Sequence, residues 1–149
     1  MKQTVTPRRT LRLLPCACAN LRRASRAVTR LYNRELQTDG IEITQFTLLM
    51  TLDQAGEISQ KRLGELLALD STSLTRMLEL LKKRGWVRVQ EGDDRRMRIF
   101  RLTHSGRQKF QQSLRHWKRA QGHLRTALGE KTMGELSRLL MEVTQRFAA

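Results

Sequence analysis

The sequence predicts a mainly α-helical protein that carries one small β-hairpin, an α+β fold organised as a single domain over residues 1–149. Apolar residues recur at spacings of three and four over most of the chain, which is the helical period. The period changes to two only between residues 87 and 102, around an acidic, glycine-containing turn. A chain of 149 residues is also long enough to bury a real core.

The first half of the chain predicts four helices in order. Residues 16–37 form the first, which ends near Gly40, and Thr44 is expected to cap a second that Gly56 stops. Ser59 caps a third and Asp70 a fourth, because each oxygen can accept from the orphan amides of a first turn. The expected inward residues are Leu63, Leu66 and Leu67 on the third helix and Leu74, Met77, Leu78 and Leu81 on the fourth. Two short helices joined by a tight turn are typical of a helix-turn-helix.

A β-hairpin is predicted after Gly85, which supplies the left-handed residue that ends the fourth helix. Val87 and Val89 alternate with polar neighbours, residues 91–94 are turn residues, and residues 98–102 return as the second strand. This hairpin is the expected wing of a winged helix-turn-helix, and we call residues 41–103 the winged head.

Two terminal helices are predicted after Thr103, which caps the first, and they are separated at Gly129. The last one carries a near-heptad stripe of Met133, Leu136, Leu140, Val143 and Phe147. Such a stripe packs either within the chain or at a subunit interface. Because helices flank the winged head on both sides, the favoured interpretation is a homodimer formed by residues 13–40 and 104–149.

The composition indicates a polyanionic partner, because 29 lysines and arginines stand against 14 acids and give a formal charge of +15. An anionic membrane surface is disfavoured by the 5% aromatic content and by the lack of an apolar run of about 20 residues. Arg12 and Pro15 interrupt the apolar stretch near the N-terminus, which therefore does not fit a secretory signal. With only two cysteines, a reducing cytoplasm is the expected location.

Short hydroxyl side chains and one arginine occupy the start of the fourth helix, on the face away from its apolar residues. They are Ser71, Thr72, Ser73, Thr75 and Arg76. We expect them to meet base edges in the major groove of double-stranded DNA, since small side chains allow close approach and a guanidinium can donate in a fork to guanine. The alternative is that Ser71 and Ser73 merely cap the helix and that Arg76 is a solvated charge.

Basic residues crowd the predicted hairpin tip, where Arg95, Arg96 and Arg98 lie beside Asp94. Arginines suit a narrow minor groove, whose potential is most negative where it is narrow. Asp94 is expected to brace an arginine through a charge-assisted hydrogen bond. The alternative is a surface salt-bridge cluster, which contributes little to stability.

The run LGELLALDSTSLTRMLELLKKRGWVRVQEGDDRRMRIFRLTHSG resembles the MarR family of bacterial transcriptional regulators. It contains the D-x-R of the wing, at Asp94 and Arg96, and the L-T-x-x-G that follows, at Leu102, Thr103 and Gly106. The helix order agrees over residues 16–147. The resemblance implies a homodimer that binds duplex DNA, a ligand cleft between the dimer and DNA regions, and a wing arginine, Arg96, in the minor groove.

The sensing mechanism is left open by the sequence. The organic-peroxide-sensing branch of this family keeps a reactive cysteine near the start of the first helix, assisted by tyrosines. This sequence resembles that arrangement at Cys16, Cys18 and Tyr32. At the position where a second tyrosine is expected, it has Ile43. Arg22 and a helix N-terminus favour a reactive thiolate, whereas a buried structural cysteine is the alternative.

No catalytic, cofactor or metal site is predicted, because His116 and His123 lie about 10 Å apart along one helix and no phosphate loop or nucleophile motif occurs. Both histidines are expected at the surface or at an interface. The predicted function is a dimeric regulator, a repressor released by a small ligand or an oxidant. The alternatives are a cysteine-based peroxide sensor of the same fold and a nonspecific architectural binder of nucleic acid.

Overall fold

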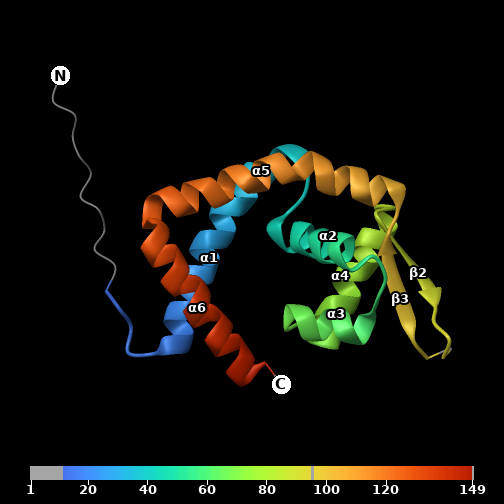
Figure 1. Cartoon of the computed structure of the whole chain (residues 1–149), viewed down its shortest axis with the longest axis horizontal. Helices are drawn as coiled ribbons and strands as arrows, with labels where there is room; N and C mark the ends of the chain where they lie inside the picture. The colour runs from blue at the N-terminus through green and yellow to red at the C-terminus, as the bar shows by residue number, and fades with distance from the viewer. Residues whose placement is uncertain (1–11, 95, 149) are drawn as a thin grey trace.

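The computed structural model describes residues 12–94 and 96–148 and is mainly helical, with one small sheet (Figure 1). The elements run α1 Ala17–Leu36, η1 Gln37–Asp39, α2 Ile43–Ala55, β1 Ile58–Ser59, α3 Gln60–Leu67, α4 Ser71–Lys83, β2 Val87–Glu91, β3 Arg98–Leu102, α5 His104–Leu128 and α6 Glu130–Phe147. The long helix α5 arches over the molecule and joins the winged head to the side that carries α1 and α6 (Figure 1). The predicted order of elements is therefore confirmed.

The sheet has three antiparallel strands in the order β1-β3-β2. The hairpin lies where the sequence predicts it, and its strands pair Val87 with Leu102 and Val89 with Phe100. The additional strand, β1, pairs Ile58 with Phe100 on the other side of β3. A two-residue strand is too short to show a period, so the sequence did not predict it. It fixes the chain before α3 to the base of the wing.

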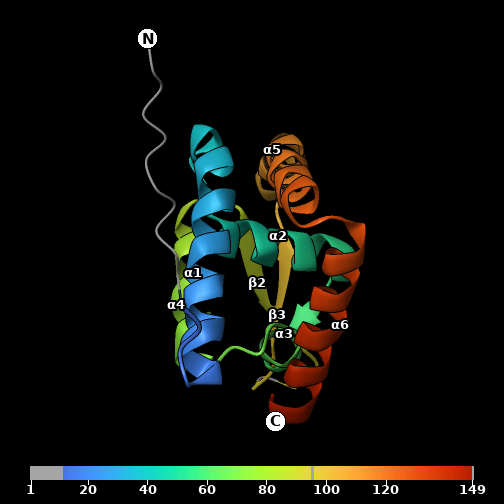
Figure 2. The same cartoon turned by 90° about the vertical axis from the view of Figure 1, so that its left-hand side faces the viewer.

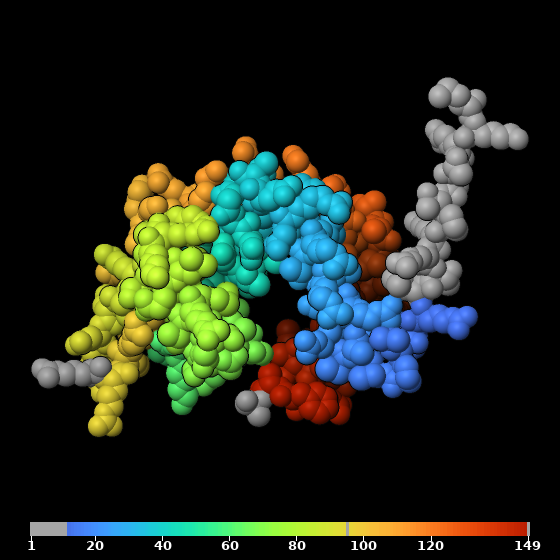
Figure 3. Space-filling view, turned by 180° about the vertical axis from the view of Figure 1, so that it is seen from behind, coloured from blue at the N-terminus to red at the C-terminus, as the bar shows by residue number. Residues whose placement is uncertain are grey.

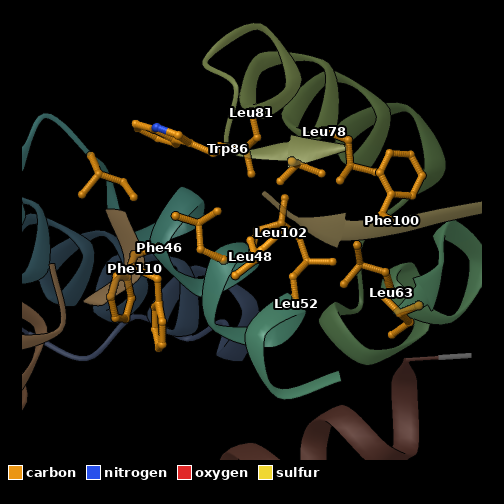
Figure 4. Packing of buried hydrophobic residues seen from close by; sticks show 14 of the residues in the cluster. Phe46, Leu48, Leu52, Leu63, Leu78, Leu81, Trp86, Phe100, Leu102 and Phe110 are labelled. Atoms are coloured by element: carbon orange, nitrogen blue, oxygen red, sulfur yellow. The ribbon is translucent and has the colours of Figure 1, made fainter. Parts of the chain in front are cut away.

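The hydrophobic core lies inside the winged head (Figure 4). Side chains from α2, α3, α4, the sheet and the first half of α5 meet there, and Phe46, Leu63, Leu78 and Phe100 are all at most 1% exposed. Phe46 also stacks on Trp117, with ring centroids 5.8 Å apart, so the core continues along α5. A close-packed interior of this kind holds α4 and the wing as one unit.

Most predicted helix ends and inward residues are confirmed, with two corrections. α2 is capped by Glu42, which forms a capping box with Gln45, and not by Thr44. A capping box starting at Glu42 leaves Thr44 inside the helix. Leu66, predicted to face inward, is 52% exposed, because α3 is only eight residues long and packs through Leu63.

The junction between the wing and α5 explains the L-T-x-x-G motif in physical terms. The Thr103 hydroxyl accepts from the backbone N–H of Gly106 and donates to the carbonyl of Gly85 at 2.5 Å. The backbone N–H of Thr103 in turn donates to the carbonyl of Trp86. A Cβ at position 106 would lie 1.9 Å from that carbonyl oxygen, so only glycine allows α5 to start here.

Helix α6 has no buried residue, although it is strongly amphipathic in sequence. In Figure 2 it lies on the side of the molecule opposite α1, below α5. Its exposed apolar residues include Leu139, Leu140, Met141, Val143 and Phe147. Of the predicted stripe, Met133 and Leu136 are half-buried and the remaining members are exposed, so intrachain packing covers only part of it. Within the described ranges, none of the helices is long and apolar enough to cross a membrane.

Candidate nucleic-acid interface

The start of α4 is fixed by its cap. The Asp70 carboxylate accepts from the backbone N–H of Ser73 at 2.9 Å and from the Ser73 hydroxyl at 2.7 Å. These hydrogen bonds, that from the Ser73 side chain first, hold the pKa of Asp70 below its ordinary value. Ser73 therefore has a capping role here, which is the alternative that the sequence left open for it.

Of the other predicted α4 residues, one is engaged within the chain and three are free at the surface. The Thr75 hydroxyl accepts from Gln60 Nε2 at 2.8 Å, which ties α4 to α3. Ser71, Thr72 and Arg76 are exposed. Thr72 and Arg76 lie on the face of α4 away from the buried Leu74 and Leu78, whereas Ser71 lies at the first position of the helix on the side of these leucines. The exposed set is therefore two hydroxyls and one guanidinium, side chains that suit contacts with base edges and phosphates.

The wing tip is held in shape by Asp94. Its carboxylate accepts from the backbone N–H of Arg96 at 2.9 Å, and its carbonyl accepts from the backbone N–H of Met97 at 2.7 Å. Gly92 closes the tip by donating to the carbonyl of Met97. Asp94 thus orders the backbone that presents Arg96. Arg95 lies outside the described residues, so a brace from Asp94 to that side chain stays a prediction.

Arg98 links the base of the wing to α4. Its guanidinium lies 3.5 Å from Glu79 Oε1 and 5.3 Å from the centre of the Phe100 ring. The Glu79 carboxylate also accepts a hydrogen bond from Lys82 Nζ at 3.3 Å. The pKa of Glu79 is lowered mainly by this hydrogen bond from Lys82, and further by the one from Arg98. Arg98 is therefore partly engaged inside the head. Glu79 and Gln60 were missed by sequence reasoning, since only contacts between elements reveal their roles.

One predicted residue of α4, Ser71, shares a groove of about 1040 Å³ with predicted residues of the wing. Ser71 from α4 and Arg96 and Arg98 from the wing line it, together with residues of α3 and Phe147 at the end of α6. Figure 3 shows the hollow between the yellow-green helices of the head and the red end of α6. Ser71 and Arg96, which are 25 positions apart in the sequence, thus line the same groove.

The predicted redox residues lie far apart within one chain. Cys16 and Cys18 are exposed at the start of α1, so neither thiol is buried by the described part of its own chain. Tyr32 lies 14 positions after Cys18, which is about 21 Å along a continuous helix. The Tyr32 hydroxyl donates to Gln121, and burial raises its pKa. Within one protomer, no contact between Tyr32 and the thiols is possible.

The histidines take part in ion pairs between helices. His116 Nδ1 lies 2.5 Å from the buried carboxylate of Asp39, and His123 Nδ1 lies 3.4 Å from Glu35. Of the surface or interface position expected for His116, the surface part does not hold, because α5 packs on the end of α1 and the side chain is only 12% exposed. Among the residues described, no group of three or more His, Cys, Asp or Glu side chains could hold a metal ion.

Comparison with known proteins gives the same answer from sequence and from structure. The MarR family profile matches residues 41–97. The multiple antibiotic resistance protein MarR of Salmonella typhimurium is 37% identical over 78 residues, 52% of this chain and 54% of that protein. The regulator SarZ of Staphylococcus haemolyticus is 34% identical over 90 residues, 60% of this chain and 61% of that protein. The chain thus spans less than two thirds of the length of these two relatives.

Solved structures extend the likeness over the whole fold. The transcriptional regulator MosR of M. tuberculosis, in complex with DNA, superposes with a TM-score of 0.78 at 28% identity, over 89% of this chain and 98% of that one. A cysteine-to-serine mutant of MarR from E. coli, complexed with operator DNA, gives 0.77 at 26% identity, over 85% and 91%. The match therefore includes the terminal helices as well as the winged head. The winged head thus matches the MarR family of transcriptional regulators in sequence, and the fold as a whole is similar to that of solved MarR-family structures.

Proposed function

We propose that this protein is a repressor that binds a pseudo-palindromic operator as a homodimer and is released by a small ligand or an oxidant. Ser71, Thr72 and Arg76 enter the major groove, and Arg96 reaches the adjacent minor groove from the wing. Ser73 and Thr75 hold the helix that presents the others. Arg95 and Arg98 add positive charge near the phosphates, with Asp94 ordering the tip between them.

The observation that carries this proposal is the shared groove. Ser71 at the start of α4 and Arg96 at the wing tip face the same space, while Arg98 and Glu79 join the two elements at their base. A duplex that receives α4 in its major groove has its backbone and next minor groove within reach of such a wing. The structures of similar proteins in complex with DNA support the same use of this face.

A homodimer is proposed because much of the apolar face of α6 stays exposed in the described part of the chain. Leu139, Leu140 and Phe147 are between 46% and 80% exposed. A second copy that covers this face removes apolar surface from water and places two winged heads on one side of the assembly. Two-fold symmetry in the protein then requires approximate two-fold symmetry in the operator.

Release by an effector is proposed from the position of the groove. Its walls come from the head and from the end of α6, so a molecule bound there changes the placement of the head against the dimer helices. Oxidation is the second route, since Cys16 and Cys18 are accessible at the start of α1. An oxidised form of MarR from E. coli is among the similar solved structures.

The wing assignment is tested with Arg96→Ala, measured by duplex binding and thermal unfolding. We expect a loss of affinity of roughly tenfold or more, the scale of about 1–3 kcal/mol per specific contact. The melting temperature stays unchanged because Arg96 is exposed. Lys118→Ala removes the same charge from an exposed position on α5 and serves as the control. Equal affinities for the two variants would contradict the wing assignment.

Salt dependence and competition separate this proposal from a nonspecific architectural binder. If the dimer neutralises about eight phosphates, the logarithm of the binding constant falls with the logarithm of the salt concentration at a slope of about −7. Both classes show such a slope. Only a specific regulator prefers its operator over random duplex by ~10³ or more, and equal competition by random duplex would favour the architectural role.

A further inference from the structure

Helix α1 carries a row of four arginines that the contacts of the winged head leave unused. Arg22, Arg26, Arg30 and Arg34 follow one another at intervals of four residues, and we call them the arginine ridge. Each step rises about 6 Å along the helix and turns about 40° around it, so the ridge is about 18 Å long. All four side chains are exposed.

The ridge lies on an exposed face of α1, beside the face that packs against α5. The buried residues of α1, Tyr32 and Leu36, lie on the side that packs against α5. With 100° per residue, the centre of the ridge lies about 120° around the helix from the midpoint of Tyr32 and Leu36, with Arg34 farthest from that side and Arg22 nearest to it. Figure 2 shows α1 on the outer left of the molecule, with α5 and α6 toward the right.

No acid neutralises the ridge within the described part of the chain. The only carboxylate of α1, Glu35, pairs with Arg119 and His123 on α5. No salt bridge in residues 12–94 and 96–148 involves a ridge arginine. Four like charges at intervals of 6 Å repel one another, and a bound polyanion relieves that repulsion.

A fifth arginine extends the surface at the end of the ridge. Arg30 and Arg34 line a groove of about 720 Å³ together with Arg84, at the end of α4. The guanidinium of Arg84 is held in place, since it donates to the carbonyl of Gly40 at 2.8 Å and lies 4.9 Å from the centre of the Trp86 ring. The one acid of this groove, Glu42, accepts from the backbone as the cap of α2.

The form of this surface indicates which polyanion it binds. An extended row suits a regular chain of phosphates better than a single small anion, and the phosphates of one DNA strand advance 3.4 Å per nucleotide along the duplex axis. An 18 Å ridge thus spans about five nucleotides. A membrane-surface helix needs a free apolar face, whereas the face of α1 that carries Tyr32 and Leu36 packs on α5.

The ridge and α4 belong to the same broad face of the molecule. Figure 3 shows α1 in blue and the yellow-green helices of the head side by side toward the viewer, with α5 behind them. We propose that the arginine ridge is a second duplex-binding surface, which holds the DNA backbone outside the contacts made by α4 and the wing. This inference rests on the proposed function, because it requires a duplex bound at the head.

The test compares two double variants of the full chain. Arg26→Gln/Arg30→Gln removes two ridge charges, while Arg115→Gln/Lys118→Gln removes two exposed charges from α5 and serves as the matched control. Glutamine is a good helix former, so both variants retain their helices, which circular dichroism checks. Binding to the selected operator with about 15 flanking base pairs on each side is measured across a range of salt concentrations.

We expect the ridge variant to have a shallower salt slope than wild type, by about 0.9 for each lost phosphate contact, hence about 1.8 if one ridge binds and 3.6 if both do. The control keeps the wild-type slope. Equal salt slopes for the two variants would overturn the inference. A ridge variant with a weakened dimer and an unchanged salt slope would overturn it as well, because that result would assign the ridge to the subunit interface. If wild-type protein shows no preference for any duplex, the proposed function itself fails.

Discussion

Gly106 is the residue at which one added carbon has the clearest consequence. A Cβ there would lie 1.9 Å from the Trp86 carbonyl oxygen, which is a backbone atom inside the packed head. We expect Gly106→Ala to destabilise the fold by about 1–3 kcal/mol, the usual cost of overpacking, as measured by urea unfolding. Gly122→Ala, in open space on the same helix, is the control and should raise stability by roughly 0.5–1 kcal/mol. Similar effects at both positions would contradict the close approach.

Asp70 makes the start of α4 sensitive to acid. Its pKa is lower in the folded protein than the ordinary value of about 3.9, chiefly because of the hydrogen bond from the Ser73 side chain. Ionised Asp70 therefore adds stability that is present above the unfolded pKa and is lost as the pH falls through the folded pKa. Asp70→Asn should be less stable than wild type at pH 7, with a difference that shrinks below about pH 4. A difference independent of pH would contradict this role.

At the residue scale, local signals were predictable and contacts between elements were not. Ser59, Asp70 and Thr103 cap their helices as predicted, because a cap bonds to amides two or three residues away. Thr75 was predicted to face DNA, yet its hydroxyl accepts from Gln60, 15 residues earlier. No periodicity encodes that pair, since it depends on how α3 packs against α4.

At the element scale, helix α6 is the part whose burial depends most on a partner. Leu140 lies on its exposed apolar face, and Gln145 is exposed elsewhere on the helix. Leu140→Glu should shift the protein toward monomer, because a charge at a desolvated interface is strongly unfavourable. Gln145→Glu adds the same charge and should keep the dimer. Sedimentation equilibrium distinguishes them, and a wild-type monomer at micromolar concentration would contradict the proposed interface.

The elements themselves follow closely from the sequence. The hairpin, the breaks at Gly56, Gly85 and Gly129, and both terminal helices are where the patterns placed them. The strand β1 was not predictable, because its two residues become a strand only when β3 lies beside them. Element identity is thus mainly local information, whereas the third strand is a product of tertiary packing.

At the scale of the whole molecule, charge and shape act together. A formal charge of +15 indicates a polyanion but gives no position for it. The fold supplies positions, with Ser71 and Arg96 on one groove and the arginine ridge on an exposed face of α1. The long helix α5 runs from the winged head to the side that carries α1 and α6, so it is the element through which we expect a change at one region to reach the other (Figure 1).

The central claim is that two winged heads read one duplex together. Selection of bound sequences from a random duplex pool tests it most directly, with wild-type protein and Arg76→Gln run in parallel. We expect a pseudo-palindromic sequence whose half-sites lie about one helical turn, ~10 base pairs, or a multiple of it apart, and a weakened base preference for Arg76→Gln. Recovery of duplexes with no common sequence or symmetry, at an affinity equal to that of the unselected pool, would contradict it.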